Sequence, residues 1–360
     1  MLNHSRLNII QFSQSSQFLL FKFEINMTYL DPAPLVSMAT AYWNSATLIA
    51  AVKLGVFDVL AQGAQPLENI ARTLKCDEIA TDALLTALLA LNLLEREDGQ
   101  YSNTALSATY LVSGQAQSLG GALLYNADVY PLWGQLSEVI QQGDSVKDPH
   151  AYLGGDQGKT RRFVYGMHHR ALGVGRAVSA LIDLSAVSYL ADIGGGPGTY
   201  SALLTQKYPT LKADVLDLPA VVEVAQNIMQ EMGAQGQVDC LPYDYYQDSL
   251  APNKYDGALI SGVLHREQPE QVKAMFKSVA QALPIGSPLW ISDVMLNDDR
   301  SGPLFGAMFA LNMRVLAHDG RCHSVTEQSS WLQELGFEII DTHHLPPPIN
   351  YTLIHAQKVR

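Results

Sequence analysis

Apolar and polar positions alternate with helical spacing through most of the first third of the chain. Apolar residues recur in this way over residues 35–60, 67–75 and 80–94, which predicts three helices. The polar stretch 95–104 follows the third helix and contains an Asp-Gly pair, a sequence typical of a tight β-hairpin turn. A helix-turn-helix followed by a hairpin indicates a winged-helix domain.

After residue 181 the pattern changes to short, partly β-branched apolar segments separated by helical ones, which is typical of a buried parallel sheet covered by helices. The segments with strand character are residues 187–193, 212–218, 255–265, 288–296, 337–341 and 351–356. Helices are expected at residues 123–143, 161–172, 200–207, 270–283, 301–316 and 326–335. The predicted fold class is therefore α/β, with an N-terminal all-α winged-helix domain.

Composition and charge narrow the functional classes. The 360 residues are 48% hydrophobic and carry a net charge of −12, so neither a nucleic acid nor an anionic membrane surface is expected as a partner. Cys76, Cys240 and Cys322 lie far apart and lack the spacing of metal ligands, which favours free thiols, a reducing cytoplasm and no metal site. The apolar run at residues 18–21 is too short to cross a membrane. We expect an acidic cytoplasmic enzyme.

A winged helix can bind DNA when its second helix presents Arg, Lys, Asn or Gln to the major groove. Residues 80–94 contain no basic residue, and the hairpin that follows opens with acidic side chains. Apolar residues crowd this helix beyond what one buried face needs, which predicts contact with a second copy of the chain rather than with DNA. The leucines concerned are Leu84, Leu85, Leu88, Leu89 and Leu91.

A glycine-rich turn, Asp-Ile-Gly-Gly-Gly-Pro-Gly from Asp192 to Gly198, joins the first predicted strand of the α/β part to its helix. Backbone can approach a ligand there because side chains are absent. The dinucleotide pattern Gly-x-Gly-x-x-Gly fails because Thr199 stands at its third glycine position. Asp192 also lies close to where a phosphate would bind, which favours a cation instead. A dehydrogenase is therefore disfavoured.

Acid-x-Gly-x-Gly-x-Gly at a strand-to-helix turn resembles the first motif of the class I S-adenosylmethionine (SAM) methyltransferases. The next predicted strand ends in Asp217, whose carboxylate can accept both hydroxyls of a ribose. A turn with a helix-capping Asp is the alternative interpretation. From about residue 31 onward the chain is similar to the plant-type and bacterial small-molecule O-methyltransferases. This resemblance implies a Rossmann-like seven-stranded sheet, a homodimer, SAM as cofactor and a small-molecule methyl acceptor.

The resemblance also suggests how the chain divides. Residues 27–120 correspond to a winged-helix dimerisation domain, 121–180 to a helical linker with pocket helices, and 181–360 to the SAM-binding domain. Residues 1–26 have no counterpart in this scheme. We expect them to be a disordered extension or the product of a misassigned start codon.

The cofactor residues follow from the resemblance by position. Asp217 is expected to bind the ribose, Asp244 the adenine amino group and Tyr245 the adenine ring, with Tyr243 standing where the family has glycine. Arg170 is expected to donate to the cofactor carboxylate. The full expected set is Asp192, Gly194, Gly195, Gly196, Gly198, Asp217, Leu218, Asp244, Tyr245, Ser261 and Arg170.

The resemblance places three side chains at the methyl acceptor, namely Phe163, Met167 and Asn312. Phe163 and Met167 at helical spacing are equally well explained as ordinary core residues. The adjacent His168 and His169 point about 100° apart on a helix, so they cannot share one metal ion. We expect both to be surface or hydrogen-bonded histidines.

Methyl transfer from a sulfonium is an in-line displacement, so the protein has to align the acceptor and remove its proton. A neutral imidazole suits that task, and His265 ends a predicted strand. The family's Leu-His-Asp-Trp segment, whose histidine is the base, reads Leu-His-Arg-Glu here. Its two orienting acids align with Asp293 and Cys322, so one is missing, and Glu267 or His323 is the candidate to compensate. A purely structural histidine is the alternative.

Three functions remain open on the sequence. The first is SAM-dependent O-methylation of a hydroxyl on a small aromatic or polyketide-like molecule. The second is C- or N-methylation by positioning alone, with which the altered Leu-His-Arg-Glu segment is compatible. The third, a non-enzymatic winged-helix regulator, is disfavoured by the intact cofactor residues.

Overall fold

The computed structural model describes residues 31–115, 117–145, 152–347 and 349–360. The chain divides into two compact units, Met1–Ala46 and Thr47–Arg360, and each is described by itself. The extension expected at residues 1–26 lies outside the described residues.

The described part of the first unit consists of α1 (Ala33–Thr40) and the start of α2 (Tyr42–Leu54). Apolar side chains are exposed along it, namely Leu35, Val36, Met38, Tyr42 and Trp43. The helical stretch Ala33–Leu54 has a mean hydropathy of 1.3 and is, by length and composition, long enough to cross a membrane. The buried face of an interface helix has the same composition, so this stretch needs an apolar partner of some kind.

The second unit begins with a winged helix, as the hydrophobic pattern predicts. A small sheet has the order β1-β3-β2, and Asp77 caps its main helix by accepting a hydrogen bond from the Ala80 backbone N–H. The elements are α3 (Val56–Leu60), β1 (Gln65–Pro66), α4 (Leu67–Leu74), α5 (Glu78–Ala90), β2 (Leu94–Glu97), β3 (Gln100–Asn103) and α6 (Ala105–Tyr110). The single helix expected over residues 35–60 is wrong. The chain breaks there into α1, α2 and α3, and Gly55 begins α3 with a left-handed φ of 80°.

The leucines of α5 serve the core of this winged helix. Leu85 and Leu88 are fully buried with Phe57 and Ile70, and Leu84 and Leu89 pack against the same cluster. Leu85 and Leu88 are therefore used inside the subunit, whereas contact of the partly buried Leu84, Leu89 and Leu91 with a second copy stays a prediction. In the described N-terminal residues the large exposed apolar side chains are concentrated on α1 and the first turn of α2.

Three helices lead into the α/β part, namely α7 (Gly120–Trp133), α8 (Leu136–Gln142) and α9 (Gln157–Leu181). The helix expected over residues 123–143 is interrupted between α7 and α8, at Gly134 and Gln135. The helix α9 is longer than residues 161–172, because Asp156 caps it by accepting a hydrogen bond of 2.9 Å from the Lys159 backbone N–H. Gly158 therefore lies in the first turn of α9.

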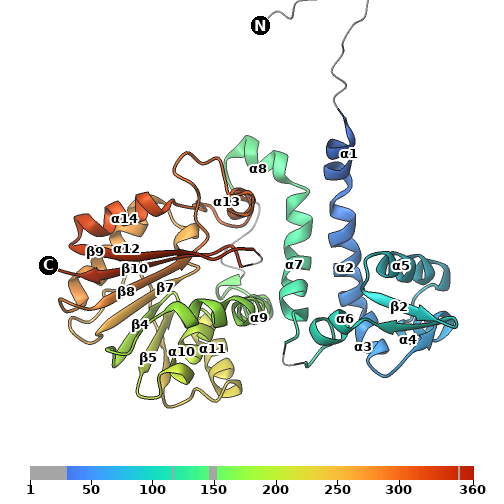
Figure 1. Cartoon of the computed structure of the whole chain (residues 1–360), viewed down its shortest axis with the longest axis horizontal. Coiled ribbons are helices and arrows are strands. Elements are labelled where there is room, and N and C mark those ends of the chain that lie inside the picture. The colour runs from blue at the N-terminus through green and yellow to red at the C-terminus, as the bar shows by residue number, and fades with distance from the viewer. Residues whose placement is uncertain (1–30, 116, 146–151, 348) are drawn as a thin grey trace, which may run out of the picture. The chain divides into compact units, whose positions relative to one another are not determined.

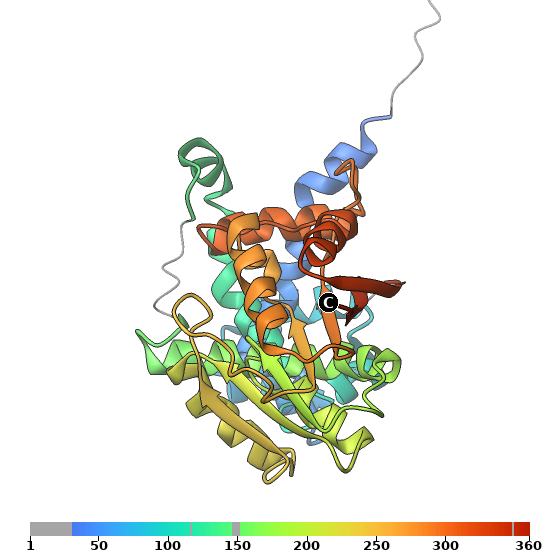
Figure 2. The same ribbon diagram turned by 90° about the vertical axis from the view of Figure 1, so that its left-hand side faces the viewer.

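A seven-stranded sheet confirms the predicted fold class, and Figures 1 and 2 show it from two sides. Its order is β6-β5-β4-β7-β8-β10-β9, in which β10 is antiparallel to both β8 and β9 and the other neighbours are parallel. The strands are β4 (Tyr189–Ile193), β5 (Lys212–Asp217), β6 (Val238–Pro242), β7 (Gly257–Ser261), β8 (Pro288–Asp293), β9 (Phe337–His344) and β10 (Thr352–Lys358).

Helices cover both faces of this sheet (Figure 1). Adjacent strand residues point to opposite faces, so Leu216 packs in one cluster with α12 and α14 while Val215 packs in another with α9, α10 and α11. A further cluster joins α7, α8 and α13. The helices are α10 (Thr199–Lys207), α11 (Pro219–Glu231), α12 (Pro269–Ala282), α13 (Leu304–Leu316) and α14 (Val325–Glu334). The carboxyl ends of β4, β5, β6 and β7 consequently share one edge, where ligands bind in such sheets.

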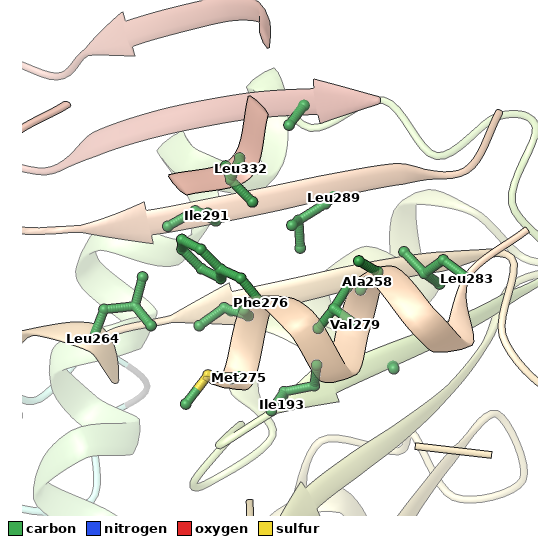
Figure 3. Close-up of a cluster of buried hydrophobic side chains, with 14 of the residues drawn as sticks. Ile193, Ala258, Leu264, Met275, Phe276, Val279, Leu283, Leu289, Ile291 and Leu332 are labelled. Carbon is green, nitrogen blue, oxygen red and sulfur yellow. The ribbon is translucent and has the colours of Figure 1, made fainter. Parts of the chain in front are cut away.

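The contribution of core packing to the stability of this sheet can be tested at Phe276 of α12. Its side chain is fully buried and points toward Ile291 and Leu332 (Figure 3). Phe276→Ala should lower the free energy of unfolding by about 3–5 kcal/mol, because the removed ring leaves a cavity that the sheet cannot fill. Lys277→Ala, an exposed neighbour on the same helix, should change it by less than about 0.5 kcal/mol in the same urea titration. Equal effects of the two variants would contradict this account of the core.

Candidate functional site

A cavity of about 640 Å³ lies at the carboxyl edge of the parallel strands. It gathers most of the residues that the sequence singles out, although they are spread over 150 positions of the chain. Those lining it are Phe163, Met167, Arg170, Asp192, Gly194, Gly195, Gly196, Asp217, Leu218, Asp244, Tyr245, Ser261, His265 and Asn312. Gly198 and Asp293 do not line it. Gly198 begins α10 with a φ of 71°, and Asp293 lies behind His265.

The glycine turn holds the backbone against the cavity. The Gly194 N–H donates to the Leu216 carbonyl at 2.8 Å, which ties the end of β4 to β5. A Cβ on Gly195 would stand 2.7 Å from the Asp192 carboxyl carbon, closer than packed atoms allow. Gly196 has a left-handed φ of 54°. The turn therefore requires glycine for contact and for conformation, as its sequence predicts.

Asp192 is a buried carboxyl group inside this turn. Ser201 donates a hydrogen bond of 2.6 Å to its Oδ2, while its Oδ1 has no hydrogen-bond partner among the described residues. Burial raises the pKa of Asp192 to about 7, because the charged form loses its hydration. A positively charged ligand in the cavity would stabilise the ionised form. The donor set therefore fits a cationic cofactor and disfavours a phosphate.

Asp217 at the end of β5 is fixed from two sides. The backbone N–H groups of Gly196 and Leu218 donate to its two oxygens at 2.8 and 2.7 Å. Burial raises the pKa of this carboxyl group, and these two hydrogen bonds oppose the rise. Each oxygen keeps a free lone-pair direction, so the carboxylate can still accept the two hydroxyls of a ribose.

The loop after β6 carries the other two expected cofactor contacts. Asp244 accepts hydrogen bonds from the Tyr246 backbone N–H and from the Gln247 side chain. The Tyr245 hydroxyl donates to Glu267 at 2.7 Å, and the Tyr246 hydroxyl donates to the other oxygen of the same carboxylate. This loop is thereby tied to the turn that follows β7, and the cavity has a wall built from both.

His265 lies in that turn, in the short 3₁₀ helix η2 (Leu264–Arg266), and not within the strand itself. Its Nδ1 is 2.5 Å from Oδ1 of Asp293, which also accepts the Val294 backbone N–H at 2.7 Å. The Phe309 ring packs edge-on against the imidazole with 4.8 Å between centroids. A carboxylate on Nδ1 favours the tautomer with its proton there, which leaves Nε2 free to accept a proton.

Neither Glu267 nor His323 replaces the second acid that would orient His265. Glu267 is occupied by the hydroxyls of Tyr245 and Tyr246, and His323 Nε2 bonds the Glu267 carbonyl at 2.9 Å. Cys322 is buried, which raises the pKa of its thiol and keeps it neutral. Within the described residues Asp293 is the one carboxylate bonded to the imidazole of His265.

Aromatic and sulfur side chains form the opposite wall. Phe163 packs against Tyr125 with 5.6 Å between ring centroids, and Met167 belongs to the same cluster. The Asn312 side chain accepts a hydrogen bond of 2.9 Å from the Trp133 indole N–H. All three expected acceptor contacts thus lie on one cavity, a result that plain core packing of Phe163 and Met167 does not require.

Sequence reasoning missed several residues of this cavity. Phe309 contacts two functional side chains of the cavity, since the Arg170 guanidinium lies 5.2 Å from its ring centroid and the His265 imidazole packs edge-on against the same ring. The sequence signal for Phe309 was its position about one helical turn before Asn312, which places the two side chains on the same face of the helix. Tyr125 carried no local signal, because its partner Phe163 is distant in the sequence.

The two adjacent histidines on α9 are hydrogen-bonded, as predicted. His168 Nδ1 lies 2.8 Å from the Thr199 hydroxyl, and His169 Nδ1 lies 2.7 Å from the Tyr165 carbonyl. Burial lowers the pKa of His168 to about 4, so it is neutral near pH 7. A search of the described residues finds no group of three or more His, Cys, Asp or Glu side chains able to hold a metal ion.

Family models match two segments of the chain. Residues 36–113 match the O-methyltransferase dimerisation domain, and residues 137–338 match the O-methyltransferase domain. The second match alone covers more than half of the chain. It contains both the glycine turn and the turn that carries His265.

Individual proteins are similar over nearly the whole length. The 3-hydroxy-5-methyl-1-naphthoate 3-O-methyltransferase of Streptomyces sahachiroi is 32% identical over 88% of this chain and 92% of its own. The N,N-dimethyltransferase OxyT of Streptomyces rimosus is 28% identical over 90% of this chain and 96% of its own. Human N-acetylserotonin methyltransferase in complex with SAM aligns with a TM-score of 0.82 at 26% identity, covering 93% of this chain and 100% of that one.

The variant Asp192→Asn tests how much the burial of this carboxyl group lowers the free energy of unfolding. The folded protein binds the Asp192 proton more tightly than the unfolded chain, so the stability linked to this proton is lost as pH rises from about 4 to about 7. The asparagine cannot ionise, and its advantage over wild type should grow by about 2–3 kcal/mol between pH 5 and pH 8. Urea unfolding of the cofactor-free protein at both pH values measures this difference in stability. Asp239→Asn, on the exposed side of β6, should show no such growth, and the account fails if both variants behave alike.

Proposed function

This chain belongs to the family of SAM-dependent O-methyltransferases, and from that premise we propose that its methyl acceptor is a hydroxyl on a small aromatic or polyketide-like molecule. The support lies in the cavity, where the aromatic and apolar side chains of Phe163, Met167 and Tyr125 face the candidate base. The relative from Streptomyces sahachiroi is named for a hydroxynaphthoate, a fused aromatic acceptor of this kind.

SAM supplies an activated methyl group on a sulfonium, and the residues at the strand ends fit it. We assign the ribose hydroxyls to Asp217, the adenine to Asp244 and Tyr245, and the methionine carboxylate to Arg170. Asp192, with one oxygen unpartnered among the described residues, faces the cationic part. Gly194, Gly195 and Gly196 let the backbone approach, while Leu218 and Ser261 close the sides of the site. Gly198 acts indirectly, by starting α10.

His265 is the proposed general base, and the observation that carries this role is its short contact with Asp293 at the cavity wall. Nε2 takes the acceptor proton as the oxygen attacks the methyl carbon, and Asp293 stabilises the imidazolium that forms. The Asp293 carboxylate also holds the ring in one orientation. The remaining contribution is alignment, which Phe163, Met167 and Asn312 supply to the acceptor.

N-methylation is the second candidate, since OxyT is named an N,N-dimethyltransferase. An amine acceptor that is already neutral needs a base less than a hydroxyl does. A panel of purified phenols, catechols and arylamines, each followed by transfer of a labelled methyl group from SAM, separates the two. Transfer to hydroxyls alone supports the first proposal, and preferential transfer to amines replaces it with the second.

His265→Ala should reduce methyl transfer to a phenolic acceptor by about 10²–10⁴-fold, the usual effect of losing a general base. SAM affinity measured by calorimetry should stay nearly unchanged, because the assigned cofactor contacts lie on other residues. The pH dependence of kcat should lose one ionisation step in the variant. His343→Ala, a histidine of β9 away from the cavity, serves as the control and should leave turnover intact. Full activity of His265→Ala would reduce this histidine to a structural role.

A homodimer is the proposed assembly, supported by the match to the dimerisation domain at residues 36–113. The exposed apolar side chains of Ala33–Leu54 then contact a partner subunit rather than a membrane. Three free cysteines suit a cytoplasmic location. We keep the division into a dimerisation domain (27–120), linker and pocket helices (121–180) and a SAM-binding domain (181–360) as part of this proposal.

Light scattering of the purified protein should give twice the chain mass of 39.3 kDa without detergent. Leu35→Asp combined with Met38→Asp should shift the mass toward the monomer, because charges in an apolar interface stay unpaired. Ile285→Asp, equally exposed but in the loop between α12 and β8, is the matched control and should remain dimeric. A monomeric wild type, or one that needs detergent to stay in solution, would contradict the proposed assembly.

A further inference from the structure

Arg266 is a cationic side chain of the cavity that none of the roles above uses. It directly follows His265 in the 3₁₀ turn, is half-buried and lines the cavity. Within the described residues its guanidinium forms neither an ion pair nor a hydrogen bond. A partly desolvated guanidinium carries five N–H donors, so leaving all of them unmatched is costly.

Three carboxylates around the cavity are hydrogen-bonded to groups other than Arg266. Glu267 accepts from two tyrosine hydroxyls, Asp217 accepts from two backbone N–H groups, and Asp293 accepts from His265. Asp319 lines the same cavity and forms no ion pair with Arg266 in the described structure. The positive charge is therefore available to a ligand.

The charge of Arg266 reaches both sides of the cavity, because it opposes the burial-driven rise in the pKa of Asp217 and Tyr245 on the cofactor side as well as that of Tyr125 on the acceptor side. Burial raises the pKa of the Tyr125 hydroxyl to about 12, and Arg266 is the strongest of the charges that oppose this rise. Tyr125 belongs to the aromatic wall that includes Phe163. Arg266 thus lines the same cavity as this wall and as His265, which it directly follows in the chain.

Building on the proposed function, we propose that the acceptor is an aromatic hydroxy acid whose carboxylate binds to Arg266. A planar guanidinium holds a carboxylate through two parallel hydrogen bonds, which fixes orientation as well as position. Because Arg266 and His265 are consecutive, a ring anchored in this way presents its hydroxyl to Nε2 of the base. The cavity then has two guanidinium groups for two carboxylates, with Arg170 on the cofactor and Arg266 on the acceptor.

A matched pair of acceptors tests this inference, namely a hydroxynaphthoate and the naphthol that lacks its carboxylate. Wild type should prefer the hydroxynaphthoate in kcat/KM, and Arg266→Gln should lower kcat/KM for it by about 10–150-fold, the range for a hydrogen bond to a charged group. The variant should methylate naphthol at the wild-type rate. Arg266→Lys should restore only part of the loss, because an ammonium lacks the planar fork.

Binding provides a readout that does not depend on turnover. Calorimetry with S-adenosylhomocysteine present should show that wild type binds a naphthoate without a hydroxyl and that Arg266→Gln binds it about tenfold or more weakly. SAM affinity should stay within about twofold in both. Asp319→Asn is the control, and it should keep the preference for the acid.

Three results would overturn the inference while the proposed function stands. The first is methylation of both acceptors with equal efficiency by wild type, and the second is an equal loss on both acceptors in Arg266→Gln. The third is loss of the preference in Asp319→Asn, which would mean that the preference does not depend on Arg266 alone. Methyl transfer by wild type to amines of the panel and to none of its hydroxyls would instead refute the proposed function and remove this inference with it.

Discussion

Two buried carboxylates fix the turn that carries His265, and the arrangement of the site depends on them. Asp293 holds the imidazole from the end of β8, and Glu267 joins the same turn to the loop of Tyr245 and Tyr246. Carboxyl groups that are 1% and 3% exposed are stable only when hydrogen bonds satisfy them, so neither contact can open without a large cost. Buried hydrogen bonds consequently join the cofactor wall to the base.

Much of this fold could be predicted because its signals are local. The strands β4 and β5, the glycine turn and the helices that follow each have a periodicity or a conformational requirement visible within ten residues. Asp217 ends its strand and meets the Gly196 N–H for the same reason, since parallel neighbours place their carboxyl ends together. The resemblance to known methyltransferases then suggested the roles of these residues in binding and catalysis, which their positions alone do not define.

The rest depended on contacts between distant parts of the chain. Trp133 and Asn312 are 179 residues apart, and nothing near either one indicates their hydrogen bond. Glu267 was read as a possible support for His265, yet its oxygens are taken by tyrosines from another loop. The helix break at Gly55 was missed because apolar spacing continues across it, while the left-handed backbone there interrupts the hydrogen-bond pattern.

The burial of Asp192 links the cofactor to the lifetime of the protein. A carboxyl group whose pKa is raised to about 7 weakens the empty fold at neutral pH, and a bound cation reverses that penalty. Ligands that bind only the folded state stabilise it in proportion to the logarithm of their concentration. When SAM is scarce, more chains should therefore be unfolded at any moment and exposed to proteases. The amount of enzyme in a cell would then follow its supply of methyl donor, without any dedicated regulatory domain.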